Sequence, residues 1–268
     1  MLNVISLGAG VQSSTMAMMA THGEITPMPA CAIFADTGDE PVAVYEWLNW
    51  LTARLPFPTL RVSIGTLSNK SVAIKITKDG KRSYLQHSVP VFVLNANGTK
   101  GMARRHCTRD FKLDPIRRQI RKLGASTKTP CTTWIGISTD EASRMKPSKD
   151  GAQKNRWPLI ENNMSRAQCV IWMKSNGYPT PPRRACTYCP YHSDEHWLSM
   201  PEEELQAAFR YELALQGAYS KASELDGTPF LHSSLIPLPA ALAKIRDHPR
   251  PPEQQDIFSN ECEGMCGV

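Results

Sequence analysis

Short apolar runs and longer amphipathic segments alternate along the first 65 residues. The apolar runs at 3–7, 30–38 and 59–65 each lead into a glycine, as buried strands that end in turns do. Between them, the segment 12–23 contains good helix formers and ends at a glycine, and 40–55 has apolar residues at helical spacing. This strand–helix order predicts an α/β fold, with an open, mostly parallel, twisted sheet and helices on both faces.

The middle of the chain is less regular. Residues 68–101 mix a helical stretch with a hairpin or loop, and we expect them to form an insertion over the sheet edge. We predict an α/β core at 1–177 and a helical, cysteine-bearing C-terminal lobe at 178–268 that packs on it. The remaining predicted elements are a strand at 131–138 and helices at 114–124, 165–177 (with Ser165 as N-cap), 201–217 and about 239–247.

The charge is unevenly distributed. There are 31 Lys and Arg against 25 Asp and Glu, a net charge of +6, and basic residues cluster at 104–109, 117–122 and 181–184. These clusters indicate either a solvated basic surface or a site for a polyanion, such as a phosphorylated small molecule or a nucleic acid.

The sequence also bears on the compartment. No stretch approaches the roughly 20 apolar residues of a membrane span. The first ten residues lack a basic segment ahead of an apolar run, so we expect no secretion signal and a cytoplasmic protein. In a reducing compartment the eight cysteines serve as ligands, nucleophiles or core residues rather than disulfides.

Two loops follow the first two predicted strands, and both carry candidate ligand-binding residues. Glycines in 6–15 let the backbone approach a ligand, and the next helix offers free N–H groups to an anion, although an ordinary tight turn has the same composition. The loop at 34–41 would lie beside it, at the carboxyl ends of adjacent strands. The candidates are Ser6, Gly8, Gly10, Gln12, Ser13, Ser14, Asp36, Thr37 and Gly38.

A third candidate segment is 134–146. Gly136 permits close approach of a ligand, and Arg144 can hold phosphate or sulfate bidentately. The alternative is a surface ion pair between Glu141 and Arg144, which are three residues apart.

Five of the eight cysteines fall into two groups. Cys31, Cys131 and Cys169 lie within apolar patterns and are interpreted as core residues. Cys186 and Cys189 form a C-x-x-C pair, which can bind a soft metal, act as a redox dithiol or pack. A zinc site would need two more ligands, and His192 and His196 could supply them.

These segments resemble the adenine-nucleotide alpha-hydrolase, or PP-loop, superfamily, and within it the sulfonucleotide (phosphoadenylyl-sulfate, PAPS, and adenylyl-sulfate, APS) reductases. "GAGVQS" stands in place of the Ser-Gly-Gly-x-Asp-Ser loop, with Gln12 at the aspartate position. Phosphoadenylyl-sulfate reductases often carry glutamine there, and their turn after the second strand resembles "DTG". The resemblance implies a Rossmann-like fold that binds PAPS, APS or ATP, and Gln12 favours an already activated nucleotide over ATP cleavage.

The resemblance extends to the iron–sulfur adenylyl-sulfate reductases. Their Cys-Cys pair, lysine and Pro-Leu match Cys107, Lys112 and Pro115 here, with Thr108 in place of the second cysteine. Their later C-x-x-C matches Cys186 and Cys189. The resemblance therefore implies a 4Fe–4S cluster with three of its four thiolate ligands at these cysteines.

The last residues, "ECEGMCGV", resemble the mobile Glu-Cys-Gly segment of these reductases. The resemblance implies that Cys262 is either the nucleophile or the fourth cluster ligand, with Cys266 taking the other role. The thiolate of the nucleophilic cysteine would attack the sulfate sulfur of the nucleotide to give S-sulfocysteine and an adenosine phosphate. A thioredoxin-like reductant would then release sulfite. Members of the family often form homodimers.

Two other functions stay open. One is an ATP-dependent iron–sulfur thiolation enzyme, a sulfurtransferase acting on tRNA or DNA, in which the basic clusters would bind the phosphate backbone. The other is a noncatalytic zinc or cluster module that binds a nucleotide as a sensor.

Overall fold

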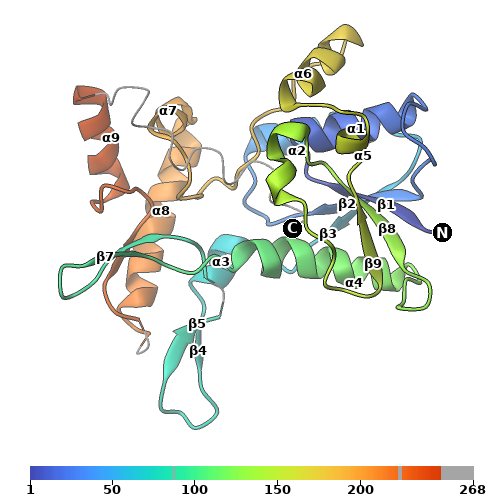
Figure 1. The fold of residues 1–268 in the computed structure, drawn as a ribbon. Helices are drawn as coiled ribbons and strands as arrows, with labels where there is room; N and C mark the ends of the chain where they lie inside the picture. Colours follow the sequence, from blue (N-terminus) through green and yellow to red (C-terminus); the bar gives the residue numbers. More distant parts are fainter. Residues whose placement is uncertain (87, 223–224, 249–268) are drawn as a thin grey trace. The chain divides into compact units, whose positions relative to one another are not determined.

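The computed structural model describes residues 1–86, 88–222 and 225–248, and these form two compact units (Figure 1). The first unit comprises Met1–Ile64 and Thr108–Arg184. The second comprises Gly65–Cys107 and the described residues from Ala185 onward. Residues 68–101 therefore group with the part of the chain after Arg184, and the boundary placed at 177 on sequence grounds stays a prediction.

A five-stranded parallel sheet forms the centre of the first unit, in the order β3-β2-β1-β8-β9. This confirms the predicted α/β fold. The four predicted strands form where the apolar runs lie, and β9 is an additional edge strand of polar sequence that the hydrophobic pattern did not predict. The strands are β1 (Asn3–Leu7), β2 (Cys31–Ala35), β3 (Thr59–Val62), β8 (Cys131–Ile135) and β9 (Gln153–Arg156).

Helices cover both faces of this sheet, as predicted (Figure 1). On one face Ile5, Leu7 and Trp134 pack against α1, α2, α5 and α6, and on the other Val4 and Cys131 pack in the cluster that contains α4 residues. Side chains of successive strand residues thus alternate between the two cores. The helices are α1 (Val11–Thr21), α2 (Val42–Thr52), α4 (Asp114–Lys122), α5 (Pro158–Glu161) and α6 (Arg166–Ser175).

Three local features of this unit position the residues discussed below. A π-helical turn (Arg109–Leu113) precedes α4, and a 3-10 turn (Thr139–Arg144) follows β8. Ser165 caps α6 as predicted: its Oγ accepts from the Gln168 N–H at 3.2 Å, and the Gln168 side chain accepts from the Ser165 N–H at 2.7 Å. This capping box fixes the first residue of α6, Arg166, at a defined place.

The second unit combines short strands and helices with the longest described helix, α8 (Glu202–Tyr219). Glu212 of α8 ties its parts together, because its buried carboxylate accepts the N–H groups of Leu231 at 2.8 Å and Leu238 at 2.7 Å. None of the described helices is both long and apolar enough to cross a membrane. The elements are α3 (Leu67–Ser71), the hairpin β4 (Ile74–Ile76) and β5 (Ser83–Leu85), the antiparallel sheet of β6 (Phe92–Leu94), β7 (Lys100–Met102) and β10 (Thr228–Phe230), and α7 (Asp194–Ser199), α8 (Glu202–Tyr219) and α9 (Leu238–Asp247).

Candidate functional site

A small pocket, of about 40 Å³ and partly open to solvent, lies in the first unit at the carboxyl ends of β1 and β8. In an open parallel sheet this is the edge where ligands bind. The strand order is consistent with this, since the connections after β1 and β8 run to opposite sides of the sheet. The pocket is lined by Ser6, Gly8, Gly10, Val11, Gln12, Ser13, Ile135, Gly136, Arg166, Pro182 and Arg184.

The loop between β1 and α1 shapes one wall of this pocket. Ala9 has a φ of 59°, an unusual conformation for a non-glycine residue, between two glycines. The Gly8 N–H donates to Ser13 Oγ at 3.1 Å, which folds the loop back on the first turn of α1. That first turn lines the pocket, and the backbone N–H groups at the start of a helix can bind an anion.

Gly136 forms the opposite wall, after β8. A Cβ built on it would lie 2.8 Å from Ser13 N and 2.9 Å from Ser13 Cα, closer than real Cβ contacts. Both are backbone atoms, so a side-chain rotation cannot relieve the clash. Glycine at 136 is therefore required for β8 to approach the start of α1 this closely.

Two arginines, Arg166 and Arg184, give the pocket its charge. None of its described lining residues is an aspartate or a glutamate. Arg166 also donates to Gln12 Oε1 at 3.5 Å, and Gln12 Nε2 lies 3.4 Å from Ser138 Oγ and 3.3 Å from Glu141 Oε2. Gln12 therefore links the first turn of α1 to the start of α6 and to the turn after β8.

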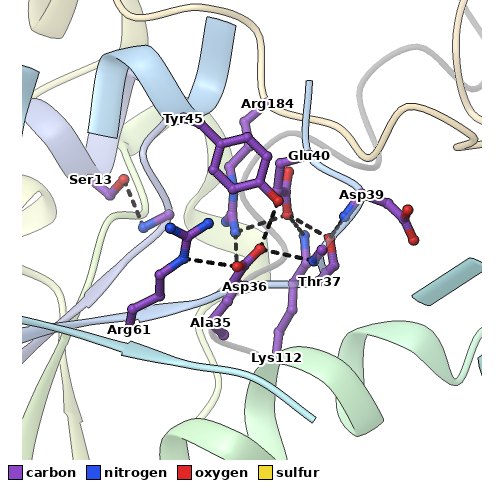
Figure 2. Close-up of polar contacts among 12 residues, drawn as sticks. Ser13, Ala35, Asp36, Thr37, Asp39, Glu40, Tyr45, Arg61, Lys112 and Arg184 are labelled. Carbon is purple, nitrogen blue, oxygen red and sulfur yellow. Dashed lines mark hydrogen bonds and ion pairs between the residues drawn. The ribbon is translucent and has the colours of Figure 1, made fainter. Parts of the chain in front are cut away.

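A buried ionic network holds Arg184 in place (Figure 2). Oε1 of Glu40 lies 3.4 Å from Arg184 NH2 and 3.6 Å from Lys112 Nζ, and it accepts from Thr37 Oγ1 at 3.2 Å. Burial raises the pKa of the Glu40 carboxyl, but the charges of Lys112 and Arg184 outweigh it and lower the pKa below its ordinary value. Glu40 is thus a buried carboxylate that positions a pocket arginine.

Asp36, at the end of β2, belongs to the same region (Figure 2). It accepts from the Gly38 N–H, from Tyr45 OH and from Arg61 Nε, each at 2.8 Å. Burial, together with the Asp36 carboxylate, raises the pKa of Tyr45 well above its ordinary value, so Tyr45 remains a donor. Asp36 and Gly38 form a braced turn beside the pocket and do not line it.

The structure brings together six of the predicted nucleotide-binding residues and places five elsewhere. Ser6, Gly8, Gly10, Gln12, Ser13 and Gly136 line the pocket. Asp36, Thr37 and Gly38 lie in the turn after β2. Ser14 is buried and accepts from Trp47 Nε1 at 2.9 Å. Arg144 pairs with Glu141, the alternative considered above, although both side chains are largely buried.

Sequence reasoning did not select Arg166, Arg184 or Glu40 as site residues. The signal for Arg184 was the basic run at 181–184, and the signal for Glu40 was the pair of acids that follows the "DTG" turn. Lys112, which the resemblance associates with the cluster, pairs here with Glu40.

The cysteines of the predicted cluster lie in the second unit where they are described. Cys186 and Cys189 share a tight turn, with the Cys189 N–H donating to Cys186 O at 2.9 Å. His192 Nε2 lies 3.0 Å from the same carbonyl oxygen. Across residues 1–86, 88–222 and 225–248, no three His, Cys, Asp or Glu side chains are grouped to hold a metal ion. Cys262 and Cys266 lie outside the described residues.

Cys31, Cys131 and Cys169 are buried, which confirms their interpretation as core residues. Burial raises the pKa of the Cys131 thiol to about 11 and that of the Cys169 thiol to about 12. Both are therefore protonated and poorly nucleophilic at neutral pH.

Comparison with known proteins finds a similarity in structure. No protein-family model matches the sequence, and no curated protein matches it. Among solved structures, the chain is similar to a phosphoadenylyl-sulfate (PAPS) reductase from Candida auris, in its phosphate complex, at 13% identity and a TM-score of 0.41. The match covers 68% of this chain and 76% of that one.

Proposed function

We propose that this chain is a sulfonucleotide reductase-like enzyme whose pocket binds the phosphosulfate of an adenine nucleotide. The observation that supports this most strongly is the pocket lining: the first turn of α1, the hydroxyl of Ser13 and two arginines, with no carboxylate among its described residues. Helix N-terminal N–H groups and guanidinium groups are the donors that proteins use for phosphate and sulfate. The residue at position 12 is consistent with this, because a neutral glutamine adds no negative charge beside the anion.

The proposed reaction has two steps. The Cys262 thiolate attacks the sulfur of the sulfate group, an S–S bond forms, and the bond from sulfur to the bridging oxygen breaks. The adenosine phosphate leaves with that electron pair, and Arg166 and Arg184 stabilise the charge that develops on it. A thiol of the thioredoxin class then attacks Cys262 Sγ, forming a disulfide and releasing sulfite.

The described cysteines do not by themselves provide the ligands of the implied cluster. One tight turn holds Cys186 and Cys189, which suits two ligands of a common metal, but within the described part of the chain no third ligand joins them. A 4Fe–4S cluster is usually held by four thiolates. The cluster stays a prediction, and no step of the proposed reaction uses it.

Replacing Arg166 by alanine should lower sulfite production. Arg166 lines the pocket and contacts Gln12, so its loss removes one charge-assisted contact, worth roughly 10- to 100-fold in affinity. The measurement is the rate of sulfite release from PAPS and from APS with a thiol reductant, at subsaturating nucleotide. Lys154→Ala, at an exposed lysine that does not line this pocket, is the matched control and should retain full activity.

The same assay tests the nucleophile. Cys262→Ser should abolish sulfite release while leaving nucleotide binding intact. The rate of sulfite release by Cys266→Ser tests whether the second thiol is also required. Absence of sulfite from either nucleotide with wild-type protein would contradict the proposal. Release of pyrophosphate from ATP together with thiolation of tRNA or DNA would instead favour the sulfurtransferase alternative.

A further inference from the structure

The second unit contains a strongly basic segment, residues 65–107. This segment has eight Lys and Arg against one acid, Asp79, so its net charge is +7, whereas that of the whole chain is +6. The excess of positive charge in the protein therefore lies in this segment. Its basic residues are Lys70, Lys75, Lys78, Lys81, Arg82, Lys100, Arg104 and Arg105. None of them lines the pocket of the first unit or takes part in the proposed reaction.

Four of these cations belong to the hairpin of β4 and β5. Among the described strands, these two pair only with each other. Two further bonds extend the pairing into the turn: the Thr77 N–H donates to Arg82 O at 2.9 Å, and the Arg82 N–H donates to Thr77 Oγ1 at 3.1 Å. The hairpin extends from α3, with its turn at the far end (Figure 1). Its backbone is regular, so the register fixes which side chains share a face.

One face of the hairpin combines cations with an aromatic ring. Lys75 lies directly opposite Tyr84 in the register, so their side chains share a face. Arg82 lies on the same face, two residues before Tyr84. The two cations are exposed and the tyrosine is half-buried. The opposite face carries the apolar residues Ile74, Ile76 and Leu85.

The three lysines of the hairpin are available to an anionic partner. Lys75, Lys78 and Lys81 are exposed, and within the part of the chain that the structure describes none of them has a side-chain hydrogen bond or an ion pair. Asp79 lies in the turn, where its Oδ1 accepts from Thr77 Oγ1 and from the Lys81 N–H. Its charge offsets one cation, and the hairpin keeps a net charge of +3.

This combination of groups favours single-stranded nucleic acid as the partner. Lysine and arginine side chains neutralise phosphates of the backbone, and an aromatic ring among them stacks on an unpaired base. A duplex presents the phosphates without an unpaired base. An anionic membrane would engage the apolar face, but among the described apolar residues there only Ile76 is largely exposed, at 68%.

Lysines on edge strands also have a protective role, because they prevent pairing with strands of other chains. That role requires neither an aromatic ring on the same face as Lys75 nor further lysines in the turn, at positions 78 and 81. The ring and the turn therefore distinguish a binding surface from a protected edge.

We propose that the hairpin β4–β5 binds single-stranded nucleic acid, with Lys75, Lys78 and Lys81 at the phosphates and Tyr84 stacked on a base. The inference goes beyond the proposed function, which concerns the pocket of the first unit, and it does not depend on that function. Lysines and a stacking ring contact the backbone and any base face, so the binding has little sequence preference.

The test measures fluorescence anisotropy of a labelled thymidine oligonucleotide of about 20 nucleotides, long enough for one such site. The logarithm of the wild-type affinity should fall linearly with the logarithm of salt concentration. Lys75→Ala/Lys78→Ala/Lys81→Ala should weaken binding by roughly 10- to 100-fold at low salt and reduce the salt slope by about 2, the value for three phosphate contacts.

The matched control is Lys128→Ala/Lys154→Ala/Lys174→Ala, which removes the same charge from exposed positions of the first unit. It should bind the oligonucleotide nearly as wild type does. Tyr84→Ala should weaken binding about tenfold without changing the salt slope, and Tyr84→Phe should retain wild-type affinity. Circular dichroism of each variant checks that the fold is intact.

The outcomes separate this inference from the proposed function. No binding by wild type at low salt, or equal losses in the two triple variants, would overturn the inference and leave sulfite production unaffected. Tighter binding of a duplex that is unchanged in Tyr84→Ala would also overturn it. If vesicles of phosphatidylserine and phosphatidylcholine bind the protein and the oligonucleotide does not, the hairpin is a membrane-binding element and the inference is wrong.

Discussion

Gly136→Ala should weaken nucleotide binding by roughly 100-fold or more. The added methyl group would lie 2.8 Å from Ser13 N, and backbone atoms cannot move aside as a side chain can. The loop after β8 must therefore separate from the start of α1, which misaligns the N–H groups that line the pocket. Two lost charge-assisted hydrogen bonds account for this magnitude.

The same substitution should lower the free energy of unfolding by about 1–3 kcal/mol, as overpacking of a well-packed contact does. Gly10→Ala is the matched control for stability, since its Cβ would meet only Arg184 Cβ, at an ordinary 3.7 Å. Urea unfolding followed by circular dichroism measures stability, and calorimetry measures binding. Wild-type affinity in Gly136→Ala would show that the close approach of β8 and α1 does not build the binding site.

Glu40→Gln should be the most destabilising change at the site, by about 3–5 kcal/mol at pH 7. It leaves Lys112 and Arg184 buried without the carboxylate that both contact. Removing one member of a buried ion pair typically costs this much, because the remaining charge has lost its solvent and its partner. Glu46→Gln, at an exposed position on α2, is the control and should change stability by less than about 0.5 kcal/mol.

The effect of Glu40→Gln should depend on pH in a defined direction. The pKa of Glu40 in the folded protein is lowered, so its contribution to stability is present above the unfolded-state value of about 4.5 and is lost as pH falls through the folded-state pKa. The stability difference between wild type and variant should therefore shrink in acid. A difference that is constant from pH 7 to pH 3 would contradict an ionised Glu40.

The sequence predicted the sheet because its central strands are continuous apolar runs. Ile5, Phe34 and Trp134 are completely buried, and each lies in such a run. Strand β9 could not be found this way, since Gln153 and Asn155 line a cavity and leave no apolar alternation. The hydrophobic pattern detects a strand through its buried apolar residues, so it does not detect a strand that faces a polar cavity.

The glycine loop and Gly136 could be predicted because local backbone geometry demands glycine there. The ionic network could not, since Arg184 lies 144 residues from Glu40 in sequence and no local pattern links them. Ser14 was predicted to bind the nucleotide and does not line the pocket. A serine in the first turn of a helix suits a phosphate ligand, but the Ser14 hydroxyl accepts the N–H of the Trp47 indole.

The most direct test of the central claim is a crystal structure of the protein with adenosine 5′-phosphosulfate. We predict that the phosphosulfate lies in the pocket between β1 and β8, accepts N–H groups from the first turn of α1, and contacts the guanidinium groups of Arg166 and Arg184. A nucleotide bound away from these groups, or an empty pocket at saturating nucleotide, would contradict the proposed function.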